Sequence, residues 1–570
     1  MDANMSMYPS RSNGKARWAA LASAVALSLI AASAQAAVSQ IEERKISQSD
    51  ERKNMKRVGH TDLQGRPAYM PDIISYPNGK YYAFVGMHSG SPVSVPACPQ
   101  YLPNPLKGNA CENNGTMIID VSDPKKPVEK YLIPSPAGGQ TQSQRMCWGS
   151  KLPDGTSGKV YMLRNVQGGA SSGYEMWDVT NVEAPTLVSA LRNLRSTHKP
   201  YWECSSGIAY LPGSKDAVLS PPPAALWRQA QSLMIVDWGN PSAPGKYIRT
   251  VGLPGSQPGA TGAVPSALHG AISAFEHPQA MQKLARTDDV IGNRIYSAWG
   301  VGDDGVLTTH DRKKLLPAAY GGTWVPAKPD SADAPTEAEL IGPASATVTY
   351  YLMSPDQGGH TAMPVFGLNP PSFAKFNEFG TRDVVLLSSE ATSDGVNGRC
   401  NEAPHFSFIV DVTVENSMSS PPGTRVQHDM YHGPWNLSTM SVDERSGANY
   451  WRGDYCGRGA RFGVHSSEEN FNNPMYGRLT TIAYFNGGVR LWDIREPQAP
   501  REVGFYVPYA NSKTNPSGYM TNNVEIDNRG YVFIVDRNGA GLDILELTGC
   551  AKKIVESGVY CKDLENDNAE

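Results

Sequence analysis

The stretch GVRLWDIREPQAP, residues 488–500, carries the pattern that decides the fold. An apolar run of β-type residues ends at Asp493, and a short polar turn containing Pro follows it. The pattern recurs as TMIIDVSDPKKP at Asp120, YEMWDVTNVEAP at Asp178, SLMIVDWGNPSAP at Asp237 and FSFIVDVTVENS at Asp411. Two degenerate copies, VLTTHDRKKLL at Asp311 and AGLDILELTG at Asp543, complete a set of seven. A unit that recurs in this way indicates a repeat architecture.

Further strand-like runs surround most of the seven copies. KVYMLRNV precedes the copy at Asp178, and APREVGFYVP includes the end of the copy at Asp493 and continues beyond it. Four strands per repeat, in a chain with 55 Gly and 44 Pro among 570 residues, are typical of propeller blades. We therefore predict an all-β fold, a single seven-bladed β-propeller, with long insertions between strands such as 317–342 and 443–476.

The two ends of the chain are predicted to meet in the last blade. Too few residues follow Asp543 to supply a fourth strand there, whereas NMKRVGHTDL, residues 54–63, resembles the fourth-strand segment REVGFYVP. The N-terminal strand is thus expected to close the last blade and to leave no open sheet edge.

The first residues resemble an export signal. Arg11, Lys15 and Arg17 precede a short apolar stretch, 18–32, and Ala34-Gln35-Ala36 offers a cleavage site. A membrane anchor is the alternative, but a spanning helix needs about 20 apolar residues. We expect a signal peptide at 1–36, an N-terminal extension at 37–52, the propeller at 53–550 and a tail at 551–570. The mature protein would have no transmembrane span and would be periplasmic, on the cell surface or extracellular.

All eight cysteines lie after the predicted signal peptide, and an even number in an exported chain implies disulfides. Sequence alone does not fix the connectivity. Short loops favour the pairs Cys98–Cys111 and Cys550–Cys561, and elimination leaves Cys400–Cys456 and Cys147–Cys204.

Several stretches resemble the LVIVD-repeat proteins, exported or surface propellers of bacteria and archaea. Beside the apolar-Ile-Val-Asp runs, these stretches are GHTDLQGRPAY near His60, ATGAVPSALHG near His269, GARFGVHSSEEN near His465 and YFNGGVRLWDIREP near Asp493. The resemblance implies the propeller fold. It implies no particular activity, because the group has no general biochemical role that can be transferred.

Candidate chemistry lies at the starts of the innermost strands, which converge on the axis of a propeller. His269, His360 and His465 fall at matching positions of three blades, and His198 lies just upstream of the third blade. Imidazoles gathered around an axis suit Fe, Cu, Zn or Mn. The alternative is that the histidines only bond backbone groups and water in a polar channel. Arg145, Glu203, Glu390 and Glu468 are candidate channel residues or supports for the ligands.

Other motifs carry less weight. His428 and His432 have the spacing of a zinc-binding helix, but Gly433-Pro434 would break that helix. No G-x-S-x-G motif supports an α/β-hydrolase mechanism. The net charge of −4 argues against nucleic acid as a partner, and a mean hydropathy of −0.39 argues against a polytopic membrane protein.

Two hypotheses of function follow from these observations. In the first, the protein is an exported metal-dependent oxidoreductase or hydrolase that acts on a small organic substrate at a histidine-bound metal. In the second, it is a non-catalytic propeller that binds a ligand or a protein. Metal content separates the two.

Overall fold

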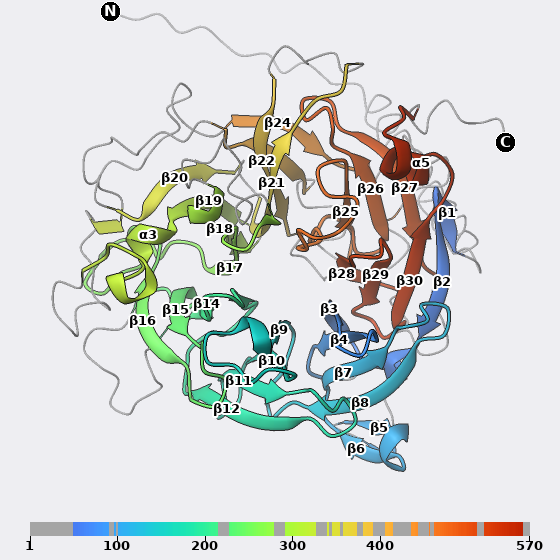
Figure 1. Cartoon of the computed structure of the whole chain (residues 1–570), viewed down its shortest axis with the longest axis horizontal. Coiled ribbons are helices and arrows are strands. Elements are labelled where there is room, and N and C mark those ends of the chain that lie inside the picture. The colour runs from blue at the N-terminus through green and yellow to red at the C-terminus, as the bar shows by residue number, and fades with distance from the viewer. Residues whose placement is uncertain are drawn as a thin grey trace, which may run out of the picture. The chain divides into compact units, whose positions relative to one another are not determined.

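The computed structural model describes residues 50–90, 96–98, 101–214, 227–278, 291–301, 303–325, 339–340, 345–353, 357–372, 380–390, 405–413, 435–442, 455, 461–509 and 518–561. The chain divides into two compact units, Met1–Ser47 and Gln48–Glu570, and the second contains the described strands. In its described residues, seven four-stranded antiparallel sheets form the blades. The innermost strands surround the centre of the ring (Figure 1).

The first four blades each take their strands consecutively from inside to outside, apart from a small hairpin in blade 1. Blade 1 comprises β3 (Ala68–Ser75), β4 (Tyr81–Met87), β7 (Gly115–Asp120) and β8 (Val128–Pro134). Blade 2 comprises β9 (Gln144–Trp148), β10 (Val160–Val166), β11 (Gly173–Asp178) and β12 (Thr186–Arg192). Blade 3 comprises β13 (Tyr201–Trp202), β14 (Ile208–Gly213), β15 (Ser232–Asp237) and β16 (Lys246–Val251). Blade 4 comprises β17 (Leu268–Ser273), β18 (Arg294–Val301), β19 (Asp303–Asp311) and β20 (Thr347–Leu352).

The last three blades complete the ring. Blade 5 comprises β21 (Gly359–Leu368), β22 (Arg382–Ser389), β23 (Ser407–Asp411) and β24 (Trp435–Met440). Blade 6 comprises β25 (Leu479–Ala483), β26 (Val489–Asp493), β27 (Arg501–Val507) and β1 (Glu51–Lys53), and bridges from Phe462 and Ser467 add an inner edge. Blade 7 comprises β28 (Thr521–Ile526), β29 (Val532–Asp536), β30 (Leu542–Leu547) and β2 (Met55–Thr61).

Short elements decorate the blades. The hairpin is formed by β5 (Leu102–Asn104) and β6 (Ala110–Glu112), and the helices are α3 (Arg312–Leu315) and α5 (Gly549–Ser557). Single 3₁₀ turns occupy Leu63–Gly65, Pro105–Lys107, Gly149–Lys151, Ile291–Asn293 and Ala318–Tyr320. Within the described ranges, every helix is too short or too polar to cross a membrane.

The predicted closure by the N-terminal strand is confirmed. β2 pairs with β30, from Met55 opposite Leu547 to Thr61 opposite Leu542. The chain also contributes β1, which pairs with β27 and covers the outer edge of blade 6. One N-terminal segment therefore completes two blades rather than one.

The repeated aspartates act mainly as turn residues, as their pattern predicts. The side chains of five of them accept a hydrogen bond from the backbone N–H two residues later, at 2.8–3.1 Å, and these are Asp120, Asp178, Asp237, Asp411 and Asp493. Such a turn lets a short polar side chain replace a backbone acceptor. Asp543 differs because it lies near the start of β30 and bonds His60 Nδ1 (2.7 Å) and Arg57 (3.3 Å) of β2.

Apolar residues pack between neighbouring blades. Phe84 and Ile118 of blade 1 form one buried cluster with Val160 and Met162 of blade 2, and all four are fully buried. Full burial of such a side chain contributes about 1.5–3 kcal/mol to the free energy of unfolding. The stacked blades thus hold the rigid ring that positions the channel residues.

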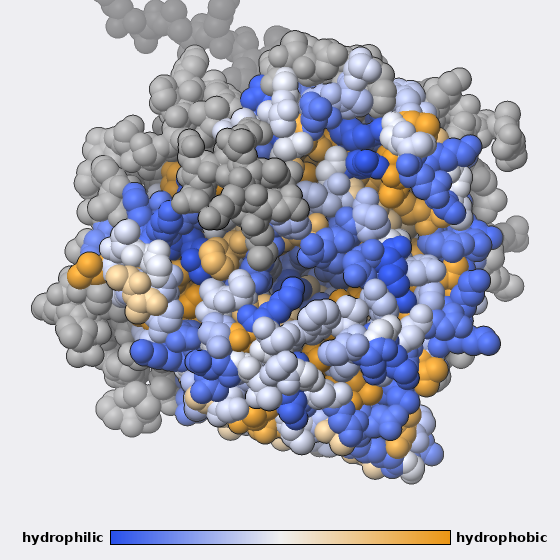
Figure 2. All heavy atoms as spheres, viewed as in Figure 1, coloured by the Kyte–Doolittle hydropathy of each residue, from blue (hydrophilic) through white to orange (hydrophobic). Residues whose placement is uncertain are grey.

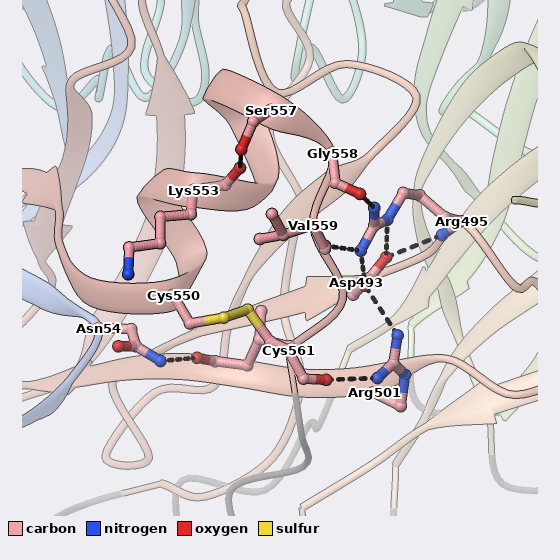
Figure 3. Close-up of a disulfide and its surroundings, with 11 residues drawn as sticks. Asn54, Asp493, Arg495, Arg501, Cys550, Lys553, Ser557, Gly558, Val559 and Cys561 are labelled. Carbon is pink, nitrogen blue, oxygen red and sulfur yellow. Dashed lines mark hydrogen bonds and ion pairs between the residues drawn. A yellow bond between two sulfur atoms is a disulfide. The ribbon is translucent and has the colours of Figure 1, made fainter. Parts of the chain in front are cut away.

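Three of the expected disulfides are present: Cys98–Cys111, Cys147–Cys204 and Cys550–Cys561. Cys400 and Cys456 lie outside the described residues. Cys550–Cys561 closes the loop that follows α5 against blade 6 (Figure 3). There Arg495 donates to the carbonyl oxygens of Gly558 (2.7 Å) and Val559 (2.9 Å), and Asp493 binds the same guanidinium.

Candidate metal centre in the channel

Seven residues, one from each blade, form a ring in the channel, hereafter the channel ring. Six lie at or just before the start of the innermost strand, and His465 lies on the inner edge that Phe462 and Ser467 add to blade 6. The seven are Tyr69, Gln142, His198, His269, His360, His465 and Asn522. The imidazole centroids of blades 3 to 6 follow one another at 4.6, 3.9 and 4.0 Å. The centre of the face in Figure 2 is hollowed and surrounded mostly by hydrophilic residues, although the four histidines are 0–7% exposed.

β-Bulges aim several of these side chains. In blade 1, Ala68 pairs with Met87 and Met70 with Gly86, which leaves Tyr69 as the extra residue. The same slip leaves His269 unpaired in β17 and His360 unpaired in β21. A bulge re-aims one side chain out of the regular alternation of a strand, and bulges are frequent beside active sites.

Neighbouring protein groups engage the imidazoles of His198, His360 and His465. His198 Nδ1 lies 3.0 Å from Gln142 Oε1, and His465 Nδ1 lies 2.7 Å from the carbonyl oxygen of Asn522. His360 Nδ1 lies 2.8 Å from Thr361 Oγ1. The Nε2 atoms of His198 and His360 both face the Tyr69 hydroxyl, at 3.2 and 3.1 Å.

Two nitrogens of the channel ring have no hydrogen-bond partner among the described residues. They are His269 Nδ1 and His465 Nε2, and both face Glu390, which follows β22. Glu390 Oε2 lies 3.5 Å from His269 Nδ1, and its Oε1 lies 3.7 Å from His465 Nε2 and 3.1 Å from Arg461. Ligand atoms of His269, His360 and Glu390 all lie within 4.8 Å of one another.

Burial keeps these histidines neutral. It lowers the pKa of His269 to about 3, and the Lys199 ammonium acts in the same direction. Burial also lowers the pKa of His198, His360 and His465 well below the ordinary value. A neutral imidazole is the form that binds a metal ion, so no proton must leave the ring to free the two unpartnered nitrogens.

A second group of charged residues, hereafter the salt layer, lies beside the channel ring. It consists of Arg145, Lys199, Glu469 and Glu525. Glu469 binds both Arg145 and Lys199, and its backbone N–H donates to Glu525 Oε2 (3.3 Å). Burial pushes the pKa of Glu469 upward, but the charges of Lys199 and Arg145 bring it below the ordinary value.

The structure brings together some of the residues singled out from the sequence and separates others. His198, His269, His360, His465 and Glu390 share the channel, and Arg145 lies in the salt layer.

The other two candidate carboxylates are engaged elsewhere. Glu203 is held by Arg312 (2.7 Å) and by the hydroxyls of Ser206 and Ser273. Glu468 accepts bonds from Thr480 and from the hydroxyl and backbone N–H of Thr481. His428 and His432 lie outside the described residues.

Six residues of the site are absent from the candidates named from the sequence: Tyr69, Gln142, Lys199, Arg461, Glu469 and Asn522. In blade 2, Gln142 enters the ring two residues before β9 begins, so strand starts alone misplace it. Lys199 and Glu469 follow predicted ligand positions by one and four residues. Their closeness in sequence to these histidines was the only signal that could have identified them.

The cluster of His269, His360 and Glu390 could hold a metal ion. His269 Nδ1 and His465 Nε2 have no hydrogen-bond partner among the described residues. Several neutral imidazoles converge, and protein groups hold Nδ1 of His198, His360 and His465. Metal-binding histidines usually donate their other ring N–H to a protein acceptor in this way.

Comparisons with known proteins support the fold. The family model of the LVIVD repeat matches residues 110–132, which run from β6 through β7 into β8. A comparison with curated proteins finds no match.

Solved structures that resemble the chain do so weakly. The Dos1 propeller has 9% identity and a TM-score of 0.38 over 87% of this chain and 96% of its own. The hydrazine synthase of Kuenenia stuttgartiensis has 12% identity and a TM-score of 0.39 over 85% and 96%. An α-L-arabinofuranosidase of Fusarium graminearum has 9% identity and a TM-score of 0.36 over 80% and 98%. Likenesses at this level carry no argument about the site, and the fold rests on the sheets described above. The chain is a seven-bladed β-propeller that carries the LVIVD repeat.

Proposed function

We propose that the protein is an exported enzyme that binds one first-row transition metal in the channel ring and acts there on a small organic substrate. The observation that carries the proposal is the pair of buried, unpartnered nitrogens, His269 Nδ1 and His465 Nε2, beside His360 and Glu390. A buried polar atom without a partner costs about 1–3 kcal/mol of stability. A metal ion that accepted both lone pairs would remove that cost.

His269, His360 and His465 would hold the metal with Glu390, and His198 would supply a fourth imidazole. Such an ion, Fe, Cu, Zn or Mn, supplies Lewis acidity or oxygen activation. Arg461 holds the Glu390 carboxylate against the ring through its bond to Oε1. Gln142 and the Asn522 carbonyl fix two imidazoles.

Tyr69 would hold a proton beside the substrate. Its hydroxyl lies between His198 and His360, and burial, assisted by Glu390, raises its pKa well above the ordinary value. The phenol therefore stays protonated at neutral pH. If a metal took the lone pairs of the two imidazoles, the single O–H of Tyr69 could donate a hydrogen bond to a substrate atom in the channel. Burial of the ring excludes bulk water, which strengthens each of these interactions.

The disulfides support the proposal that the protein is exported to an oxidising compartment. Three disulfides hold six of the cysteines, and disulfides persist mainly in oxidising compartments. We infer that the segment 1–36 directs the chain there.

Metal analysis of the purified mature protein tests the proposal. Wild type should carry close to one equivalent of a first-row metal, and His360→Ala should lose most of it. His310→Ala is the matched control, because His310 is equally buried (1%) but bonds Thr308 and Thr347 in blade 4. A wild-type protein without metal, after reconstitution with each candidate ion, would favour the ligand- or protein-binding propeller instead.

A further inference from the structure

We propose that Thr361 and Lys199, anchored by Glu469, position His360 for metal binding. This inference rests on the proposed function and adds positioning residues to it. The chain of contacts is continuous: Glu469 binds the Lys199 ammonium, Lys199 Nζ lies 3.2 Å from Thr361 Oγ1, and Thr361 Oγ1 lies 2.8 Å from His360 Nδ1. The other nitrogen, His360 Nε2, lies 3.1 Å from the hydroxyl of Tyr69, another member of the channel ring.

The anchor of this chain is rigid. Glu469 is held from one side by Arg145 and from the other by Lys199, and the Lys199 and Glu469 side chains are 2% and 1% exposed. The packing of Gly270 adds a further constraint, because a Cβ there would lie 2.6 Å from Lys199 Cε. The aliphatic part of the Lys199 side chain therefore packs directly on the backbone of Gly270, the residue after His269.

Metal binding through Nε2 sets the direction that the chain needs. An ammonium group only donates, so Thr361 Oγ1 accepts from Lys199. A metal on His360 Nε2 requires the imidazole proton on Nδ1, and the second lone pair of the Thr361 oxygen can accept that Nδ1–H. Thr361 thus supplies an acceptor for the tautomer that has its lone pair on Nε2.

The other histidines show why His360 needs this support. His465 is fixed by a backbone carbonyl, which cannot rotate, and His198 by the Gln142 amide. The Thr361 hydroxyl can rotate about its own bond, and the bond from Lys199 fixes one of its lone pairs. We therefore expect the ammonium to act on the metal through Thr361 and His360 and not by contact with it.

Zinc affinity of Thr361 variants tests the inference. Thr361→Val removes the hydroxyl at nearly constant shape, and Thr361→Ser keeps it. Measured by competition with a chromophoric chelator, Thr361→Val should bind Zn²⁺ about 10–100-fold more weakly than wild type, as for other residues that support metal-binding histidines. Thr361→Ser should retain the wild-type affinity.

Controls separate positioning from loss of fold. The metal-free valine variant should still unfold cooperatively, with a melting temperature only slightly below that of the metal-free serine variant, because His360 Nδ1 loses its partner. Gly270→Ala, which displaces Lys199 without touching Thr361, should also weaken zinc binding. Equal zinc affinity in the valine and serine variants overturns the positioning role alone. If wild type binds none of Fe, Cu, Zn and Mn, the proposed function fails and this inference with it.

Discussion

The channel ring and the seam that joins the chain ends use polar groups in opposite ways. The seam consists of β1, β2, the end of β26, β27, β30 and the loop after α5, and two of its acids have several partners. Asp493 binds Arg495 (2.7 Å) and Arg501 (3.0 Å), and Asp543 binds Arg57 and His60. In the channel ring, by contrast, two equally enclosed histidine nitrogens have no hydrogen-bond partner in the described part of the chain.

The contrast indicates that the seam stabilises the fold and that the channel ring binds a ligand. Both regions assemble residues that are far apart in the sequence, so both depend on the closed ring of blades. Satisfied polar groups in the seam stabilise the fold, whereas unsatisfied buried groups in the ring lower stability and can persist where a ligand uses them. Changes in the seam should therefore alter stability first, and changes in the ring should alter binding first.

Deletion of residues 37–64 should have the largest effect. It removes β1 and β2, exposes the outer edges of blades 6 and 7, and takes away the partners of Asp543. We expect a loss of at least about 5 kcal/mol in the free energy of unfolding, a large part of the total for a typical domain. Thermal unfolding followed by circular dichroism measures it, with metal-free His360→Ala as the control that should lose much less stability. A truncated protein that melts like the mature chain would contradict the closure described here.

Acid should destabilise the metal-free protein through its buried histidines. Burial lowers the pKa of His310 to about 3, whereas the unfolded chain has an ordinary value near 6.5. Between these values the unfolded state binds a proton that the folded state does not, so stability rises with pH and is lost as pH falls through this window. Each such histidine contributes a slope of up to about 1.4 kcal/mol per pH unit.

The variant His310→Gln isolates one of these contributions outside both regions. Urea unfolding in the presence of a chelator, between about pH 7 and pH 5, should show a shallower dependence on pH for the variant than for wild type. The difference should approach one proton. Parallel curves for the two proteins would show that His310 titrates in the folded state as it does in the unfolded chain.

Much of the fold could be predicted because its signal is local and repeated. Each copy, an apolar run that ends in Asp and is followed by a polar turn, predicts one strand and the turn after it. Seven copies therefore predict seven blades. The closing strand was predictable because residues 54–63 match a fourth strand and the C-terminal end lacks one. The copy at Asp543 misled in detail, since that residue serves the seam and not a turn.

The site was only partly predictable, because its geometry depends on bulges and on long-range contacts. His269 and His360 could be aligned by their place at a strand start, but the slip that turns them inward appears only in the pairing register. Glu203 and Glu468 lie near predicted strand starts as well, yet nearby Arg and Thr side chains engage them. Spacing along one chain carries no information on which neighbour satisfies a carboxylate.

The smallest expected effect distinguishes the two kinds of repeated aspartate. Asp120→Asn keeps the side-chain oxygen that accepts from Ser122 N and removes only the charge opposite the exposed Lys80. Exposed ion pairs contribute little and are screened by salt, so the melting temperature should change by less than about 1 °C. Asp543→Asn removes a charge that faces both Arg57 and His60 from a side chain only 10% exposed, and it should lower the melting temperature by about 1–3 °C. Melting curves at low salt and in 1 M NaCl should keep this order, since the partly buried pair is screened less. Equal shifts for the two variants would show that the seam has no special use for Asp543 and that the two aspartates are ordinary members of one repeat.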